Sequence, residues 1–350
     1  MGASISRSIQ QQQQRKREKS VARETRKEAG AAPLSVVASS ASQAAEDQLP
    51  SGRPSLASSI NEGVAATWRP DDADNRRRYH AVETSDYVLP NDDREQTRLE
   101  LQHRMLRYAF GSDAICPDAR KLIKKHGTKV LDIGCANGAW MDSLFSAGHI
   151  NCEYHGVDIA PDAFEFGTVC SAKIVVGNVL ERLPYEDNTF DYVHQRLLVL
   201  GIPKDKWTSV IKEIIRVTKP GGWIELVEVD SEFYDIGPAS NALFNPMFSV
   251  LEKRGLDICA GSNLLKNAVA AGGLINIGVK PVSIPLGWNG ELGRLHAKDV
   301  REASLSVAPF MSKALGVTNE EFTSMLEECY KEWGKTRAFA NYHCLWAQKL

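Results

Sequence analysis

A short apolar segment that runs directly into a glycine turn constrains the fold of this chain more than any other feature. Residues 130–138 read Val-Leu-Asp-Ile-Gly-Cys-Ala-Asn-Gly, which predicts a buried strand, a tight turn and then a helix. This succession recurs downstream, with strands expected at 129–133, 153–158, 173–176, 190–194 and 223–229, and helices at 139–147 and 207–217. Such alternation is typical of a doubly wound, Rossmann-like parallel α/β sheet. In these sheets, ligands bind at the carboxyl ends of the strands.

The segments on either side of this core differ from it. Residues 1–75 contain five consecutive glutamines, a charged stretch and Ala/Ser-rich sequence, with no aromatic residue before Trp68. Because this composition buries too little apolar surface to offset the entropy of ordering, we expect a disordered tail. One domain is expected over 76–350, beginning with a helix at 94–109 capped by Asn91 or Asp92. After the core at 128–230, the pattern predicts helices at 242–254, 264–271, 300–314 and 319–333, and strands at 279–284 and 338–348.

The charge of the chain is unevenly distributed. The net charge is −2, but residues 1–30 carry eight basic and three acidic side chains, so this stretch is +5 and the remainder −7. An acidic body argues against a protein that binds nucleic acid. Seven cysteines without a Cys-x-x-Cys pair indicate reduced thiols rather than a disulfide framework. We find no metal-ligand spacing, no nucleophile elbow and no apolar run long enough for a membrane-spanning helix.

A carboxylate follows the glycine turn at a suitable distance to bind a nucleoside. The second expected strand ends at Asp158, 20 residues beyond Gly138. A carboxylate at this edge can accept hydrogen bonds from both ribose hydroxyls, although Asp158 also suits a helix cap. NAD enzymes share both features. The loop here is Gly-Cys-Ala-Asn-Gly, however, which lacks the G-x-G-x-x-G spacing that a pyrophosphate requires, and it follows an acidic strand residue, Asp132.

Three downstream segments extend the pattern: residues 177–185, 190–196 and the Lys-Pro-Gly-Gly-Trp-Ile-Glu stretch within 217–225. With these in place, residues 129–228 resemble the core of class I S-adenosylmethionine (SAM)-dependent methyltransferases. That resemblance implies a sheet whose last strand is antiparallel, with SAM as the cofactor. The cofactor-binding residues that it implies are Asp132, Gly134, Cys135, Gly138, Asp158, Ile159, Asn178, Val179, His194 and Gln195.

The family assigns a part to most of these positions. The loop 134–138 would hold the methionine part of SAM, Asp158 the ribose and Ile159 the adenine ring. Asn178 replaces the usual aspartate, but its carbonyl can accept the same hydrogen bond from the adenine amino group. Val179 would offer its backbone N–H to the ring, and His194 and Gln195 would lie beside the sulfonium. Ala136 replaces the more common glycine.

A narrower resemblance covers residues 79–350. The segment 87–92, together with Glu95, Arg98, Leu99 and 101–103, resembles the N-terminal part of fungal LaeA/UMTA-type methyltransferases. In this family the first helix would form a lid over SAM. Arg98 and Gln102 lie four residues apart and would point at the SAM carboxylate, the alternative being a solvated helix face.

These motifs predict methyl transfer from SAM to a small or medium-sized organic acceptor, with O-, N- and C-methylation all open. His194 is the candidate general base, or else a histidine that shapes the strand end. Glu228 and Arg196 are the candidate acceptor-binding residues, and helices within 231–335 are expected to form the acceptor cavity. The alternatives are a LaeA-like regulator that works through partner proteins, and a protein methyltransferase.

The N-terminus carries a separate signal. Met-Gly-Ala-Ser-Ile-Ser matches the myristoylation pattern at Gly2, and the basic residues within 15–27 would supply the second membrane signal that one acyl chain needs. We therefore expect a cytoplasmic protein with peripheral membrane contact through residues 1–27. A chance match and a nuclear-import signal at 15–17 are the alternatives.

Overall fold

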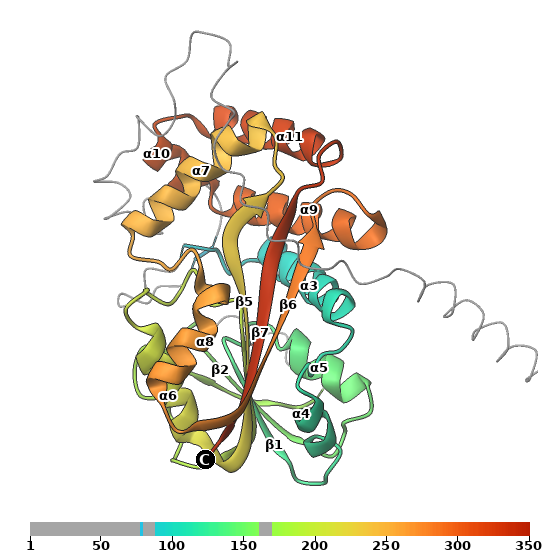
Figure 1. Cartoon of the computed structure of the whole chain (residues 1–350), viewed down its shortest axis with the longest axis vertical. Coiled ribbons are helices and arrows are strands. Elements are labelled where there is room, and N and C mark those ends of the chain that lie inside the picture. Colours follow the sequence, from blue (N-terminus) through green and yellow to red (C-terminus); the bar gives the residue numbers. More distant parts are fainter. Residues whose placement is uncertain (1–77, 80–87, 161–169) are drawn as a thin grey trace, which may run out of the picture. The chain divides into compact units, whose positions relative to one another are not determined.

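A computed structural model describes residues 78–79, 88–160 and 170–350 of the chain. A seven-stranded sheet with the order β3-β2-β1-β4-β5-β7-β6 forms its centre (Figure 1). The strands are β1 (Lys129–Ile133), β2 (Glu153–Asp158), β3 (Lys173–Val176), β4 (Phe190–Arg196), β5 (Thr218–Tyr234), β6 (Leu274–Pro285) and β7 (Phe339–Lys349). The first three coincide with the predicted ranges.

The direction of the strands confirms the predicted sheet. Strands β1 to β5 pair in parallel, and β7 runs antiparallel to both of its neighbours, β5 and β6. Strands β1 and β4 are almost entirely buried, as expected for central strands that are covered by helices on both faces. The reversal of strand order between β1 and β4 places a ligand crevice at their carboxyl ends.

Helices cover both faces of the sheet (Figure 1). On one face, α6 and α8 pack on an apolar cluster that includes Leu131, Val193 and Leu226. On the other, α4 and α5 pack on a cluster that includes Trp140 and Tyr192, and α3 packs against β7. Their bounds are α3 (Asp93–Phe110), α4 (Pro117–Leu122), α5 (Ala139–Ser146), α6 (Trp207–Val217) and α8 (Ala260–Ala271).

The remaining helices form a lobe beyond one end of the sheet (Figure 1). They are α7 (Pro238–Lys253), α9 (Gly290–Ser306), α10 (Ala308–Leu315) and α11 (Asn319–Trp333). Phe310, Phe322 and Trp333 are fully buried in the shared core of this helical lobe. The lobe extends the fold beyond the alternating core and provides the apolar surface that faces the carboxyl ends of β4 and β5.

Two predictions about the helices were wrong. The single helix expected at 300–314 is two helices, which meet at Val307. Pro309 starts α10, because a proline lacks the N–H that a continuing helix would need and fits the first turn of a new one. The helix α4 was missed, since it is only six residues long. In contrast, Asp92 does cap α3, accepting from the Glu95 N–H at 3.1 Å.

All seven cysteines lie within the described residues and are free, as the sequence predicts. In the part of the chain that the structure describes, no helix combines the length and the apolar character that crossing a membrane requires. The expected tail at 1–75 and the Gly2 signal lie outside the described residues.

Candidate functional site

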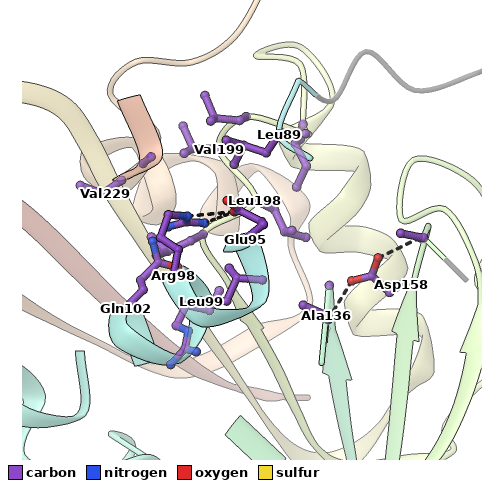
Figure 2. A pocket seen from close by; sticks show the side chains of 18 of the residues that line it. Leu89, Glu95, Arg98, Leu99, Gln102, Ala136, Asp158, Leu198, Val199 and Val229 are labelled. Atoms are coloured by element: carbon purple, nitrogen blue, oxygen red, sulfur yellow. Dashed lines mark hydrogen bonds and ion pairs between the residues drawn. The ribbon is translucent and has the colours of Figure 1, made fainter. Parts of the chain in front are cut away.

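A cavity of about 330 Å³ lies between the carboxyl ends of the strands and the helical lobe. Its walls come from α3, the ends of β1, β2 and β4, and the helices α7, α9 and α10. Figure 2 shows Arg98 and Glu95 on α3 at one side of the cavity and Asp158 at the end of β2 on the other. The cavity therefore joins the expected cofactor edge to the helical lobe.

The glycine turn after β1 brings the backbone close to this cavity. Gly134 has a φ of 69°, and a Cβ at this position would lie 2.6 Å from Leu198 Cδ2. Gly138 has a φ of 78° and begins α5. Gly134, Cys135 and Ala136 all line the cavity. The loop thus requires glycine at Gly134 both for its conformation and for its space, and it presents backbone rather than side chains to a ligand.

Asp158 stands beside this loop with its carboxylate held in place. Its Oδ2 accepts the Ala136 N–H at 2.9 Å, and its Oδ1 accepts the Ala160 N–H at 3.0 Å (Figure 2). Burial raises the pKa of this carboxyl, while these two N–H groups lower it. Each oxygen keeps a further lone pair, so the carboxylate can still receive two hydroxyls. This pair of acceptor oxygens fits the two ribose hydroxyls of SAM.

Ile159, Asn178 and Val179 line the same end of the cavity. The Asn178 Oδ1 accepts the Leu180 N–H at 3.0 Å, which orients the side chain. One lone pair of that oxygen remains for an adenine amino group. The residues that the resemblance assigns to the nucleoside therefore gather at one end, and their contacts with SAM stay predictions.

His194 lines the cavity with its ring fixed on two sides. Its Nδ1 lies 2.8 Å from Asp132 Oδ1, and its ring stacks on Trp140 with centroids 3.8 Å apart and planes at 4°. The carboxylate favours the tautomer with the proton on Nδ1. These two contacts suit a histidine that shapes the end of β4. The use of His194 as a general base stays a prediction.

The expectation that Gln195 and Glu228 face the ligand is not supported by the geometry. Neither residue lines the cavity, and Gln195 Nε2 donates instead to Glu228 Oε1 at 2.5 Å inside the protein. Consecutive residues of a strand point to opposite faces, so Gln195 points away from the face that His194 and Arg196 share. Glu228 accepts the Leu198 N–H at 2.7 Å, so it supports the cavity wall from behind.

Arg98 and Gln102 do line the cavity, but their polar groups meet a residue that the sequence analysis had not singled out. Arg98 Nη1 donates to Asp299 Oδ1 at 2.9 Å, and Gln102 Nε2 donates to Asp299 Oδ2 at 3.2 Å. Arg98 also donates to Glu95 Oε1 through Nε and Nη2. These contacts join α3 to α9. A role for Arg98 and Gln102 at the SAM carboxylate stays a prediction.

Arg196 lines the cavity beside His194. Its Nη1 lies 3.3 Å from His103 Nδ1. Burial, followed by the nearby Arg196 charge, lowers the pKa of His103 to about 3, so its Nδ1 is free to accept this hydrogen bond. Burial also lowers the pKa of Arg196. The placement agrees with a ligand-binding part for Arg196, and the ligand group it would bind stays a prediction.

Part of the cavity lining is apolar, and we call it the apolar chamber. It is lined by Phe233 at the end of β5, Phe244, Met247 and Phe248 of α7, and Met311 of α10. The rings of Phe233, Phe244 and Phe248 pack against one another with centroids 4.8 to 5.9 Å apart. The helices α8 and α11, which were also expected to form the acceptor cavity, contribute no lining residue. Instead, α8 packs on the sheet and α11 in the core of the helical lobe.

The sequence analysis missed several residues of the site. Trp140 follows the glycine loop by two residues, so its position was the one signal that could have identified it. Asp299 lies 201 residues from Arg98, and no local pattern marks it. The aromatic wall at Phe233, Phe244 and Phe248 has the helical spacing of ordinary core residues, and the sequence alone does not distinguish the two.

Several known proteins are similar to this chain. A family model described as a methyltransferase domain matches residues 130–222. N-methyltransferase verN of Clonostachys rogersoniana is 26% identical over 75% of this chain and 92% of its own length, and N-methyltransferase sirN of Leptosphaeria maculans is 28% identical over 72% and 89%. The secondary metabolism regulator laeA of Coprinopsis cinerea is 30% identical over 51% of this chain and 48% of its own length.

Among solved structures, phosphoethanolamine N-methyltransferase 2 of Haemonchus contortus, in complex with SAM, matches with a TM-score of 0.42. It is 18% identical over 71% of this chain and 57% of its own.

The matched segment contains the glycine loop and Asp158, and the sheet has the antiparallel last strand that the resemblance implies. The chain is a class I SAM-dependent methyltransferase, related to the LaeA type.

Proposed function

We propose that this enzyme transfers the methyl group of SAM to a nitrogen atom of a small, largely apolar acceptor. One observation carries the proposal: the cavity that begins at Asp158 and the glycine loop continues into a chamber of aromatic and aliphatic side chains. A volume of about 330 Å³ is in the range of small-molecule pockets. The choice of nitrogen rests on the relatives verN and sirN, which are named N-methyltransferases.

The residues of this chain would bind and orient SAM and exclude water from the transfer. Asp158 and the glycine loop would fix the nucleoside and the methionine part, and the sulfonium of SAM would supply an activated methyl group. Positioning and desolvation supply most of the rate of such a transfer. His194, clamped by Asp132 and Trp140, would form a rigid wall where β4 ends.

A screen with the full-length protein tests the proposal. The protein is incubated with SAM and matched apolar amines, amides, phenols and thiols, and release of S-adenosylhomocysteine (SAH) is measured by mass spectrometry. We expect turnover with nitrogen acceptors, with the methylated atom identified by NMR. Turnover confined to oxygen or sulfur acceptors would refute the choice of nitrogen, and turnover on histone-like peptides alone would refute a small acceptor.

A regulatory function through partner proteins is the second candidate, since laeA of Coprinopsis cinerea is named a regulator. It is the weaker one, because the matched region covers only 48% of that relative. An apolar chamber behind the cofactor edge is also not required for a protein that only senses SAM. We therefore place enzymatic transfer first.

We also propose that Gly2 is myristoylated and that this modification brings the protein to membranes together with the basic residues within 15–27. The sequence pattern supports this, and one acyl chain alone binds membranes only at about 10⁴ M⁻¹. Intact-mass measurement after expression in a eukaryotic cell should show one myristoyl group on Gly2. An unmodified Gly2, with Gly2→Ala distributed like the wild type, would contradict it.

A further inference from the structure

Asp299 is a buried carboxylate in the wall of the cavity. It lies on α9, is 3% exposed, and lines the cavity beside α3. Carboxylates are seldom buried without full pairing, because removal from water costs several kcal/mol. The hydrogen bonds that Asp299 makes therefore decide what this wall can bind.

The two oxygens of Asp299 accept hydrogen bonds from donors of different charge and at different distances. Oδ1 receives the charged Arg98 Nη1 at 2.9 Å, whereas Oδ2 receives the neutral amide of Gln102 at 3.2 Å, near the long limit for such a bond. A carboxylate oxygen can accept two hydrogen bonds. Oδ2 thus has capacity for a further donor.

Arg98 is shared between two carboxylates. Its Nε donates to Glu95 Oε1 at 2.9 Å and its Nη2 to the same oxygen, while Ser306 Oγ donates to Glu95 Oε2 at 3.0 Å. Glu95 and Arg98 are 2% and 5% exposed. One guanidinium facing two buried carboxylates leaves this group with a net charge of −1 when all three are ionised.

Other elements bring further charged or titratable groups toward Asp299. Arg196 approaches from β4, but its charge is also shared with Asp132 and Asp113. Tyr342 of β7 contributes a neutral phenol. Burial raises the pKa of Asp299, and the charge of Arg98 lowers it. The environment therefore favours a ligand that brings a hydrogen-bond donor or a positive charge to Oδ2.

Building on the proposed function, we propose that Asp299 binds the N–H group of the methyl acceptor and takes its proton during transfer. The nitrogen lone pair attacks the SAM methyl carbon, the N–C bond forms, and the C–S bond breaks with its electrons left on sulfur, which gives SAH. The proton lost by nitrogen passes to Asp299 and then to water. The acceptor is thus an apolar molecule with an N–H donor, its body in the apolar chamber.

His194 is the other basic group in the cavity wall. Its Nδ1 lies 2.8 Å from Asp132 Oδ1 and its ring stacks on Trp140, so Nε2 is its remaining acceptor, but an imidazole brings no negative charge to an incoming N–H group. Asp230 also lines the cavity, but its carboxylate already accepts from the Ser262 N–H and Oγ and faces His343 Nε2 at 3.1 Å. The remaining capacity of Oδ2 and the excess negative charge around it favour Asp299.

Binding of a matched set of probes tests the assignment without knowledge of the natural acceptor. Full-length protein saturated with SAH is titrated with 4-phenylbutylamine, 4-phenylbutan-1-ol and 4-phenylbutanoate. At saturating SAH we expect the amine to bind about tenfold more tightly than the carboxylate, and Asp299→Asn to abolish that preference. Asp257→Asn is the control, because Asp257 is buried but lies outside the cavity.

Several outcomes would overturn the proposal: no amine preference in the wild type, no binding of any probe, or a preference that survives Asp299→Asn. If Asp299→Asn does not fold, Glu95→Gln serves instead. It removes one negative charge next to Arg98 and is expected to weaken the amine preference severalfold. Failure of the proposed function appears separately, as absence of SAM binding and of methyl transfer by the wild type.

Discussion

The two halves of the cavity are built in different ways. The cofactor half comes from short contiguous segments, the glycine loop 134–138 and the strand ends at Asp158 and Asn178, and it presents backbone and small polar side chains. The acceptor half is assembled from α3, α7, α9 and α10, which lie far apart in the sequence, and is mostly apolar. Binding of a constant cofactor and of a variable acceptor can therefore change independently, and substitutions should separate them.

Of these substitutions, Asp158→Ala should have the largest effect in separating cofactor binding from acceptor binding. The change removes the carboxylate that would accept two ribose hydroxyls and that also ties Ala136 to Ala160. Hydrogen bonds to a charged group contribute about 1.5 to 3 kcal/mol each, so SAM affinity should fall by roughly 100-fold or more. Calorimetric titration of the full-length variant with SAM measures this.

Glu153→Ala is the matched control for that experiment, since Glu153 starts the same strand at its exposed end. It should bind SAM like the wild type. If Asp158→Ala bound SAM as tightly as the wild type, the nucleoside would lie elsewhere. The part of the cavity at Asp158 would then not be the cofactor half.

Phe248→Ala should affect the acceptor half alone. Phe248 lines the chamber and is only partly buried, so its truncation should cost less stability than truncation of the buried Phe244. For an acceptor identified in the screen, KM should rise about tenfold, because contact with one aromatic ring is lost, while SAM affinity stays constant. A loss of SAM affinity equal to the rise in KM would mean that the two halves are coupled.

The same contrast explains what could be predicted from the sequence. The strands, the glycine turn and Asp158 follow from local periodicity and spacing, since each element contains its own signal within about 30 residues. Gln195 was expected beyond a strand ending at 194, but β4 runs to Arg196, so alternation along the strand turns Gln195 to the face opposite His194. Asp299 and the apolar chamber arise from contacts between distant segments, for which no local signal exists.

Glu228 accepts the Leu198 N–H behind the cavity wall, and it should make the stability of the protein depend on pH. Burial raises its pKa to about 8 from the ordinary 4.5, and among the described residues its Oε2 has no hydrogen-bond partner. Between these two pH values the folded state holds a proton that the unfolded state has lost. Stability should therefore be fully present below pH 4.5 and decrease as the pH rises toward 8.

Glu228→Gln removes this titration while keeping the shape of the side chain. Between pH 5 and pH 8, the free energy of unfolding of Glu228→Gln should rise by roughly 2 kcal/mol relative to that of the wild type. This change is smaller than the full shift of the Glu228 pKa implies. Urea denaturation at both pH values measures it. A difference that does not vary with pH would show that Glu228 is ionised in the folded protein.

The smallest effect concerns the loop itself. Ala136 has a φ of 45°, in the left-handed region that a side chain disfavours by roughly 1 to 2 kcal/mol. Ala136→Gly should relieve that strain but add about 0.4 to 1 kcal/mol of chain entropy to the unfolded state, for a net gain of about 0.5 kcal/mol. Thermal unfolding measures it, with Ala139→Gly in the first turn of α5 as the control that should only destabilise. A destabilised Ala136→Gly would mean that the methyl group of Ala136 makes contacts worth more than its backbone strain, so that even the cofactor half depends on side-chain packing.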